Sequence, residues 1–77
     1  MQELLRTIVA GLVEDPSAIA ITEDAPNEEG EIVYHLHVAA DDMGRVIGKQ
    51  GRIARAIRII MRSGAAKSNQ KIAVEID

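Results

Sequence analysis

Two glycines enclose a lysine and a glutamine in the tetrapeptide Gly48–Gly51, and the segments on either side carry apolar residues at helical spacing. Glycine readily adopts the left-handed backbone geometry that ends one helix and turns the chain into the next. We therefore predict a short helix over 43–47 and a longer helix from about 51 to 63, closed by Gly64. The tetrapeptide restricts the fold to architectures in which two helices meet at a tight corner.

The other segments follow helix and strand patterns. Apolar positions at helical spacing in residues 2–13 predict an amphipathic helix. Alternating or β-branched apolar residues predict strands over 17–22, 31–40 and 71–75. The acidic stretch 23–30 contains Pro, Asn and Gly and is expected to form the exposed turn of a hairpin. The order α-β-β-α-α-β predicts an α+β fold, a single domain over 1–77 with a three-stranded sheet and its helices packed on one face.

Periodicity also assigns side chains to inner and outer faces. In the strand 31–40, one face has Ile32, Tyr34, Leu36 and Val38, and the other has Val33, His35, His37 and Ala39. In the longer helix, the apolar side has Ile53, Ile57, Ile60 and Met61, and the basic side has Arg52, Arg55, Arg58 and Arg62. Ile59 falls on the basic side, so we expect it to be exposed.

Charge is divided sharply along the chain, although the formal net charge is only −3. Residues 43–71 contain eight of the nine basic residues and no carboxylate, which gives this block a formal charge of +8. The remaining residues combine one arginine with twelve carboxylates, for a charge of −11. Because the distribution of charge is a better guide to nucleic-acid binding than the total, this block is a candidate nucleic-acid surface. A solvated basic helix face is the alternative interpretation.

A phosphate could bind where the loop enters the longer helix. Asp41 or Asp42 is expected to cap the shorter helix, but no Ser, Thr, Asp or Asn stands at the entry of the longer one. Its first backbone N–H groups therefore stay available for an anion. Gly48 and Gly51 leave room for a close approach, and Lys49 adds charge. A plain corner between two helices is the alternative.

Other kinds of site fit the sequence poorly. The segment that starts at Gly44 is one residue short of a Walker loop and lacks its Ser or Thr, and no dinucleotide fingerprint follows a strand, which disfavours nucleotide enzymes. Tyr34 is the only aromatic residue, which excludes recognition by stacked aromatic platforms. The chain has no cysteine, and His35 and His37 have no third ligand at a readable spacing, so we expect no metal and no cofactor. No nucleophile–base pair supports catalysis.

The segment 46–58 closely resembles the I-G-x-x-G signature of KH domains, and the element order over the whole chain resembles the bacterial type II arrangement. A single small domain of this kind is similar to the KhpA family of bacterial RNA-binding proteins. In KH domains, the G-x-x-G loop clamps about four nucleotides of single-stranded RNA or DNA by the backbone. The resemblance therefore implies a non-enzymatic protein that binds single-stranded RNA, as an RNA chaperone or a post-transcriptional regulator.

The resemblance also suggests which residues bind RNA. The clamp would consist of Gly48, Lys49, Gln50 and Gly51, and an aliphatic-floored groove would be lined or flanked by Arg45, Val46, Ile47, Arg52, Ile53, Ala54 and Arg55. For Val46, Ile47 and Ile53, simple core packing is the alternative. Arg58 and Arg62 lie further along the helix and serve either RNA binding or solubility.

The resemblance further implies self-association, or association with a second KH protein of the KhpB (Jag) type, with Ile59 as a candidate dimer contact. An isolated exposed apolar residue is the alternative interpretation of Ile59. The main functional alternative is a protein-interaction module on a KH scaffold, in which RNA binding is residual. The sequence contains no apolar run long enough to span a bilayer and begins without a recognisable leader, so we expect a cytoplasmic protein with no membrane partner and no small-molecule substrate.

Overall fold

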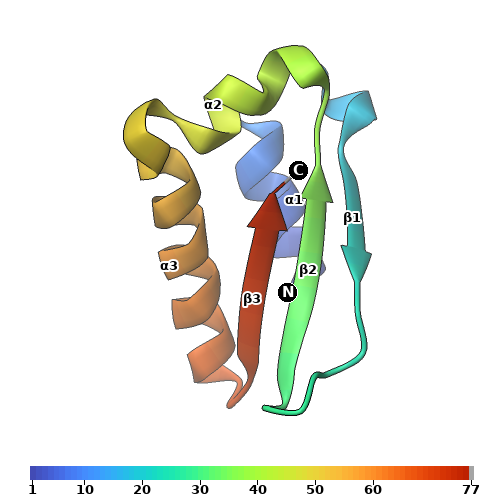
Figure 1. Ribbon diagram of the computed structural model, residues 1–77, viewed down its shortest axis with the longest axis vertical. Helices are drawn as coiled ribbons and strands as arrows, with labels where there is room; N and C mark the ends of the chain where they lie inside the picture. The colour runs from blue at the N-terminus through green and yellow to red at the C-terminus, as the bar shows by residue number, and fades with distance from the viewer. Residues whose placement is uncertain (77) are drawn as a thin grey trace.

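The computed structural model describes residues 1–76, and its elements follow the predicted order (Figure 1). The helices are α1 (Gln2–Ala10), α2 (Met43–Ile47) and α3 (Arg52–Lys67), and the strands are β1 (Ala20–Glu23), β2 (Glu31–His37) and β3 (Lys71–Ile76). Short 3₁₀ turns lie at Pro16–Ala18, Ala40–Asp42 and Lys49–Gly51. Residue 77, the last of the expected domain, lies outside the described residues.

The three strands form one mixed sheet in the order β1-β2-β3. β1 and β2 are the antiparallel arms of the predicted hairpin, with Ile21 opposite Leu36. β2 and β3 are parallel, with Tyr34 opposite Val74. A parallel pair needs a crossover connection, which the α2–loop–α3 segment supplies. The loop therefore lies at the end of the molecule where β2 finishes, and α3 returns the chain to the start of β3 (Figure 1).

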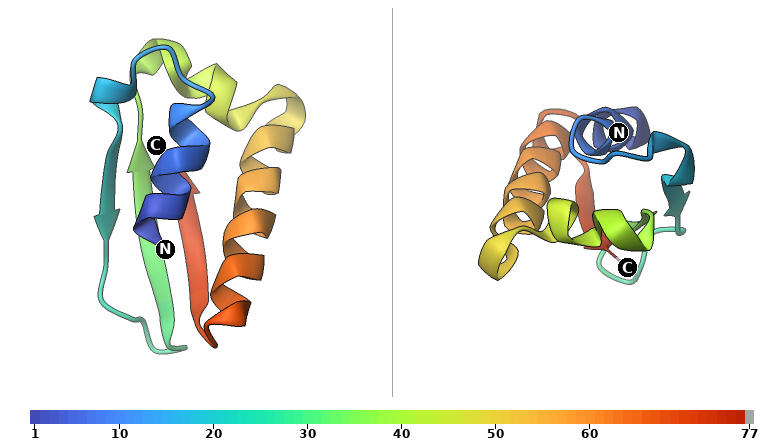
Figure 2. Two further views of the ribbon diagram at one scale, coloured as in Figure 1. Left: turned by 180° about the vertical axis from the view of Figure 1, so that it is seen from behind. Right: turned by 90° about the horizontal axis from the view of Figure 1, so that it is seen from above.

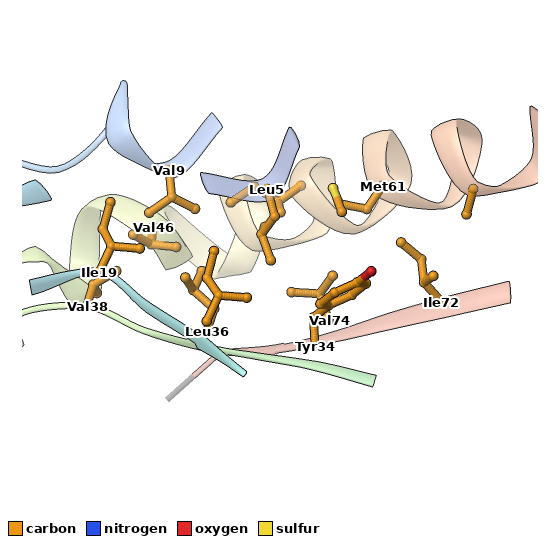
Figure 3. Packing of buried hydrophobic residues seen from close by; sticks show 13 residues of the cluster. Leu5, Val9, Ile19, Tyr34, Leu36, Val38, Val46, Met61, Ile72 and Val74 are labelled. Carbon is orange, nitrogen blue, oxygen red and sulfur yellow. The ribbon is translucent and has the colours of Figure 1, made fainter. Parts of the chain in front are cut away.

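The helices lie on one side of the sheet, as predicted. Seen from behind, α1 crosses the sheet and α3 runs along β3 (Figure 2). The core between these layers contains the expected inner residues of β2 together with α1, α3 and β3 side chains; its buried members include Leu5, Val9, Tyr34, Leu36, Val38, Val46, Ile57, Met61, Ile72 and Val74 (Figure 3). Burial, and after it the Glu23 carboxylate, raises the pKa of the Tyr34 hydroxyl above its usual value. The single aromatic ring is thus a core residue.

The boundaries of several predicted elements were wrong. The first strand begins at Ala20 and not at residue 17, because the N–H groups of Ala18 and Ile19 close a 3₁₀ turn on the carbonyls of Asp15 and Pro16. β2 ends at His37 and not at residue 40, since Ala20 at the start of β1 is the partner of His37 and pairing stops there. The first helix ends at Ala10, and residues 11–13 continue only as a turn.

Two predictions about α3 also fail. Gly64 does not close the helix, which continues to Lys67, and a Cβ at Gly64 would lie 2.9 Å from Met1 Cε and 3.3 Å from Leu4 Cδ2. Gly64 therefore allows α1 to approach α3 closely. Ile60 is 46% exposed and is not a core residue, because the buried line of α3 follows Ala54, Ile57, Met61 and Ala65. Ile59, expected to be exposed, is 58% exposed.

Candidate nucleic-acid interface

The loop between α2 and α3 contains three residues with positive φ angles. Gly48 has φ 75° and ψ 174°, Gln50 has φ 58° and ψ 25°, and Gly51 has φ 74° and ψ 17°. The Gly48 combination belongs to a region that is essentially restricted to glycine. A Cβ at Gly48 would also lie 2.4 Å from Ile53 Cγ1, whereas a Cβ at Gly51 would meet nothing within 4 Å. Gly48 is thus required by both its backbone and its neighbour, and Gly51 by its backbone alone.

The hydrogen bonds of the loop leave two of its backbone donors unused. The N–H of Gly48 donates to Gly44 O at 2.9 Å, and the N–H of Gly51 donates to Gly48 O at 3.2 Å. Within the described chain, the N–H groups of Lys49 and Gln50 have no acceptor, and no side chain caps the start of α3. The expectation of an uncapped second helix is confirmed. Free N–H groups next to the positive end of a 16-residue helix form a favourable environment for an anion.

Several basic side chains near the loop have no acidic partner. Lys49, Arg52 and Arg55 are exposed, and none of them forms an ion pair with a carboxylate among residues 1–76. Arg58 behaves differently, because its Nε donates to Val74 O at 3.1 Å and so binds α3 to the edge strand β3. Arg62 and Lys67, further along α3, are also exposed and have no ion pair with a carboxylate in this range, so unpaired positive charge extends from the loop along α3.

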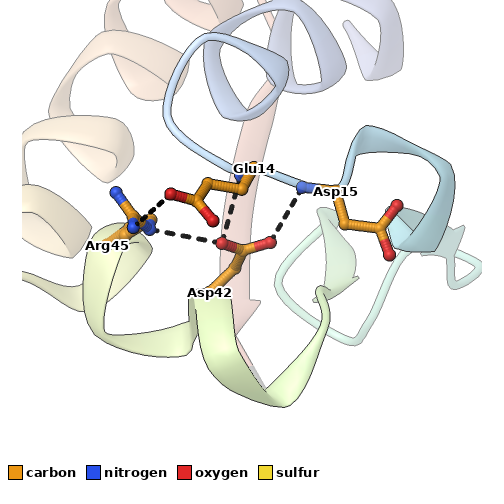
Figure 4. Close-up of polar contacts among 4 residues, drawn as sticks. All are labelled: Glu14, Asp15, Asp42 and Arg45. Carbon is orange, nitrogen blue, oxygen red and sulfur yellow. Dashed lines mark hydrogen bonds and ion pairs between the residues drawn. The ribbon is translucent and has the colours of Figure 1, made fainter.

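Arg45, another of the predicted site residues, is already engaged by carboxylates. Its Nη2 lies 2.7 Å from Glu14 Oε1, and its Nε lies 3.3 Å from Asp42 Oδ1 (Figure 4). Glu14 lies in the connection that follows α1, and Asp42 is the residue that precedes α2. Arg45 differs in this respect from Lys49, Arg52 and Arg55.

The apolar members of the predicted site divide between core and surface. Val46 and Ala54 are buried, so they support the loop from beneath. Ile47 is exposed and Ile53 is partly buried, and these two side chains flank the loop at the surface. The expected groove does not correspond to a pocket anywhere in the described part of the chain. Any ligand would therefore lie on an open surface beside the loop.

Asp42 is the one residue of this region whose role the sequence did not indicate. It occupies the N-cap position of α2, as predicted, but its side chain forms no hydrogen bond with that helix. Its Oδ1 accepts the N–H of Glu14 at 3.1 Å and its Oδ2 accepts the N–H of Asp15 at 3.1 Å (Figure 4). Nothing in the local sequence could reveal these bonds, because their partners lie 28 and 27 residues away.

His35 and His37 lie on the sheet face opposite the helices, and His35 has two carboxylates beside it. His35 Nε2 lies 2.7 Å from Asp24 Oδ2, and its Nδ1 lies 3.5 Å from Glu75 Oε2. No group of three or more metal-ligating side chains is present among residues 1–76. Nor does that part of the chain contain a helix long and apolar enough to cross a membrane.

A mixed three-stranded sheet whose parallel pair is connected by two helices and a G-x-x-G loop is the architecture of a type II KH domain. The chain belongs to the KhpA/KhpB KH domain family, whose model matches residues 2–76. This confirms both the predicted family and the predicted fold.

Curated relatives match this chain over almost its whole length. RNA-binding protein KhpA of Clostridium acetobutylicum is 46% identical over 76 residues, which cover 99% of each sequence. RNA-binding protein KhpA of Caldanaerobacter subterraneus subsp. tengcongensis is 45% identical over 99% of each, and that of Listeria monocytogenes is 45% identical over 99% of this chain and 97% of the relative.

Solved structures with the same fold include the protein Era. A crystal structure of an Aquifex aeolicus Era variant bound to GDP.AlF4- matches with a TM-score of 0.67 and 19% identity, covering 96% of this chain and 28% of that one. Era in complex with MgGDPNP and nucleotides 1506–1542 of 16S ribosomal RNA matches with a TM-score of 0.66, 19% identity and the same coverage. At this identity the likeness shows the fold alone, and it involves about a quarter of Era.

Proposed function

We propose that this chain is a non-enzymatic protein that binds single-stranded RNA by clamping the phosphate backbone at the Gly48–Gly51 loop. The observation that carries the proposal is the loop itself, which presents two unused N–H groups beside an uncapped helix and is flanked by cations without acidic partners. The names of the relatives support the same function, because they are RNA-binding proteins. The proposal treats residues 1–77 as a single KH domain.

The burial of the predicted site residues suggests a different role in RNA binding for each group of them. Gly48–Gly51 would hold the backbone, and Arg52 and Arg55 would neutralise neighbouring phosphates. Ile47 and Ile53 are placed to contact bases or sugars, whereas the buried Val46 and Ala54 shape the loop from the core. Since the only aromatic ring is buried, base stacking contributes little and sequence preference should be modest. The protein would therefore act on many RNAs, as a chaperone or post-transcriptional regulator in the cytoplasm.

The proposed clamp is tested by Lys49→Asp/Gln50→Asp. This double change reverses the charge of the loop and places two carboxylates where phosphates would bind, so it should abolish measurable binding of a labelled single-stranded RNA in an anisotropy titration. Full affinity in the folded double variant would refute the clamp.

A matched control is available at the other end of α3. Lys67→Asp/Gln70→Asp changes the net charge by the same amount at exposed positions far from the loop (Figure 1). It should weaken binding only slightly, through the long-range charge effect. Circular dichroism should show native helix and sheet content for both variants.

A second element of the proposal is association through the outer face of α3, either with another copy or with a KhpB (Jag)-type KH protein. Ile59 and Ile60 are adjacent in α3 and are 58% and 46% exposed, so together they place apolar surface on the outside of the helix. A weak single clamp would also gain apparent affinity from a second one, since linked sites bind by avidity. If RNA binding proves residual, this face would make the chain an assembly module.

A further inference from the structure

The buried carboxylate of Asp42 is the strongest polar feature that the proposed RNA contact does not use. Asp42 is 2% exposed and is the only buried charged residue in the part of the chain that the structure describes. A buried carboxylate is costly unless hydrogen bonds and opposite charge compensate it. Here both oxygens have partners: the N–H groups of Glu14 and Asp15, and the guanidinium of Arg45.

These bonds connect two segments that are distant in sequence. Glu14 and Asp15 belong to the turn between α1 and the Pro16 turn, where the chain has left helix α1 and its N–H groups need other acceptors. Asp42 precedes α2, and α2 leads directly into the loop at Gly48. The carboxylate therefore joins the turn after α1 to the helix that carries the loop (Figure 4).

Helix α2 depends on such an anchor because it has only five residues. A helix of this length has almost no stability of its own and is held by tertiary contacts. Val46 supplies one contact, since its side chain is fully buried in the core. Asp42 supplies the other, at the opposite end of α2. With both ends held, the carbonyl of Gly44 is kept where it accepts the N–H of Gly48, the first residue of the loop.

We propose that Asp42 is a positioning residue for RNA binding: by fixing α2 against the Glu14–Asp15 turn, it holds the Gly48–Gly51 loop in its binding geometry. Arg45 takes part in this anchor through Glu14 and Asp42 and is a supporting residue more than a phosphate contact. The inference rests on the proposed function of the loop, but the effect on loop geometry can be measured without RNA.

Asp42→Asn is the decisive variant because it retains the size of the side chain. An amide offers one carbonyl oxygen and an NH₂ donor, so it can accept only one of the two backbone N–H groups and would direct a donor at the other. It also loses the ion pair with Arg45. We expect the loop to adopt its RNA-binding geometry in only a minority of molecules. If that fraction is about one-tenth, the apparent RNA affinity should fall about tenfold.

Ile72→Val is the matched control, since Ile72 is a buried core residue near the start of β3, and β3 starts at the opposite end of the molecule from the loop (Figure 1). It should lower thermal stability without changing the loop. Amide hydrogen exchange, measured without RNA well below the melting temperature, should accelerate at the hydrogen-bonded N–H groups of Gly48, Gly51 and Arg52 in Asp42→Asn and not in Ile72→Val. RNA anisotropy at the same temperature should show the affinity loss only in Asp42→Asn.

The outcomes separate the inference from the proposed function. Unchanged loop exchange and unchanged RNA affinity in folded Asp42→Asn would overturn the positioning role alone. Faster loop exchange, with no RNA binding by the wild type, would retain that role and overturn the proposed function. If Asp42→Asn does not fold, hydrogen exchange is measured in Arg45→Met instead. This variant removes one of the three partners of the Asp42 carboxylate, and the Arg45 side chain is half-exposed, so the change should be tolerated. It should accelerate exchange at Gly48, Gly51 and Arg52 by a smaller factor, and no acceleration there would refute the inference.

Discussion

At the scale of single residues, the two loop glycines have different physical roles. Gly48 combines a backbone conformation that only glycine adopts with contact against Ile53, while Gly51 faces open space and needs only its left-handed φ. The sequence predicts a left-handed Gly48 at the end of the shorter helix and an open helix start at Gly51, but it does not indicate that only Gly48 is packed against another side chain. The difference depends on where the first turn of α3 places the Ile53 side chain.

This difference predicts unequal costs for alanine substitution. Gly51→Ala should lower the free energy of unfolding by about 1–2 kcal/mol, the usual cost of a left-handed non-glycine residue. Gly48→Ala should cost more, roughly 3 kcal/mol or above, because overpacking against Ile53 adds to the backbone strain. Urea denaturation of the two variants beside wild type measures both values. Equal losses would show that Ile53 moves aside freely.

At the scale of elements, α3 shows how tertiary contacts override local signals. Glycine commonly ends helices, yet α3 continues through Gly64 because Ala65 is still buried in the core and the start of the chain, with Met1 and Leu4, lies against this turn. The same packing decides which isoleucines are buried: Ile57 faces the core, and Ile60 lies to one side of it. Helical periodicity gives a stripe of possible core residues, but only the neighbouring elements determine its width.

A glycine inside a helix leads to a prediction about stability. Gly→Ala within a helix normally adds about 0.5–1 kcal/mol. At Gly44 in α2, a Cβ would meet nothing within 4 Å, so Gly44→Ala should yield the whole gain. At Gly64, the Cβ would press on the flexible ends of Met1 and Leu4, so Gly64→Ala should still stabilise, but by less. Thermal melts of Gly44→Ala, Gly64→Ala and wild type measure the two changes in stability. A Gly64→Ala protein less stable than wild type would mean that α1 cannot adjust.

At the scale of the whole molecule, the acidic turn 23–30 and the Gly48–Gly51 loop lie at different ends (Figure 1). The acidic turn between β1 and β2 is at the far end of the long axis from the loop (Figure 1). An RNA strand would be repelled from that turn and attracted to the loop and the first turns of α3. This placement keeps the carboxylates of the acidic turn away from the exposed basic residues at the loop, although the formal charge of the chain is −3 (Figure 1).

The proposed association face predicts opposite salt responses for its two activities. Pairing α3 with α3 would bring together Arg52, Arg55 and Arg62 of both copies, so added salt should strengthen self-association by screening this repulsion. RNA binding should weaken with salt, with a log–log slope of roughly −2 to −3 for three or four neutralised phosphates. Light scattering and anisotropy over the same salt range measure the two responses.

Ile59→Asp and Ile60→Asp test the face itself. Each should shift the mass measured by light scattering toward the monomer, because a buried carboxylate without a partner opposes association. If the mass is the same for wild type and both variants at matched protein concentration, the outer face of α3 is not the interface. Thr7→Asp, on the exposed side of α1, is a suitable control and should leave the mass unchanged.

The element order, the glycine loop, the basic block and the family are all legible in the amino-acid sequence, because these features depend on local backbone preferences, periodicity and charge. The folded structure was needed to show that Val46 and Ala54 support the loop from the core, that Ile60 joins Ile59 at the surface, and that Arg45 is paired. It also revealed Asp42 as the link between the turn after α1 and helix α2. These properties depend on contacts between residues far apart in the chain, which no local pattern specifies.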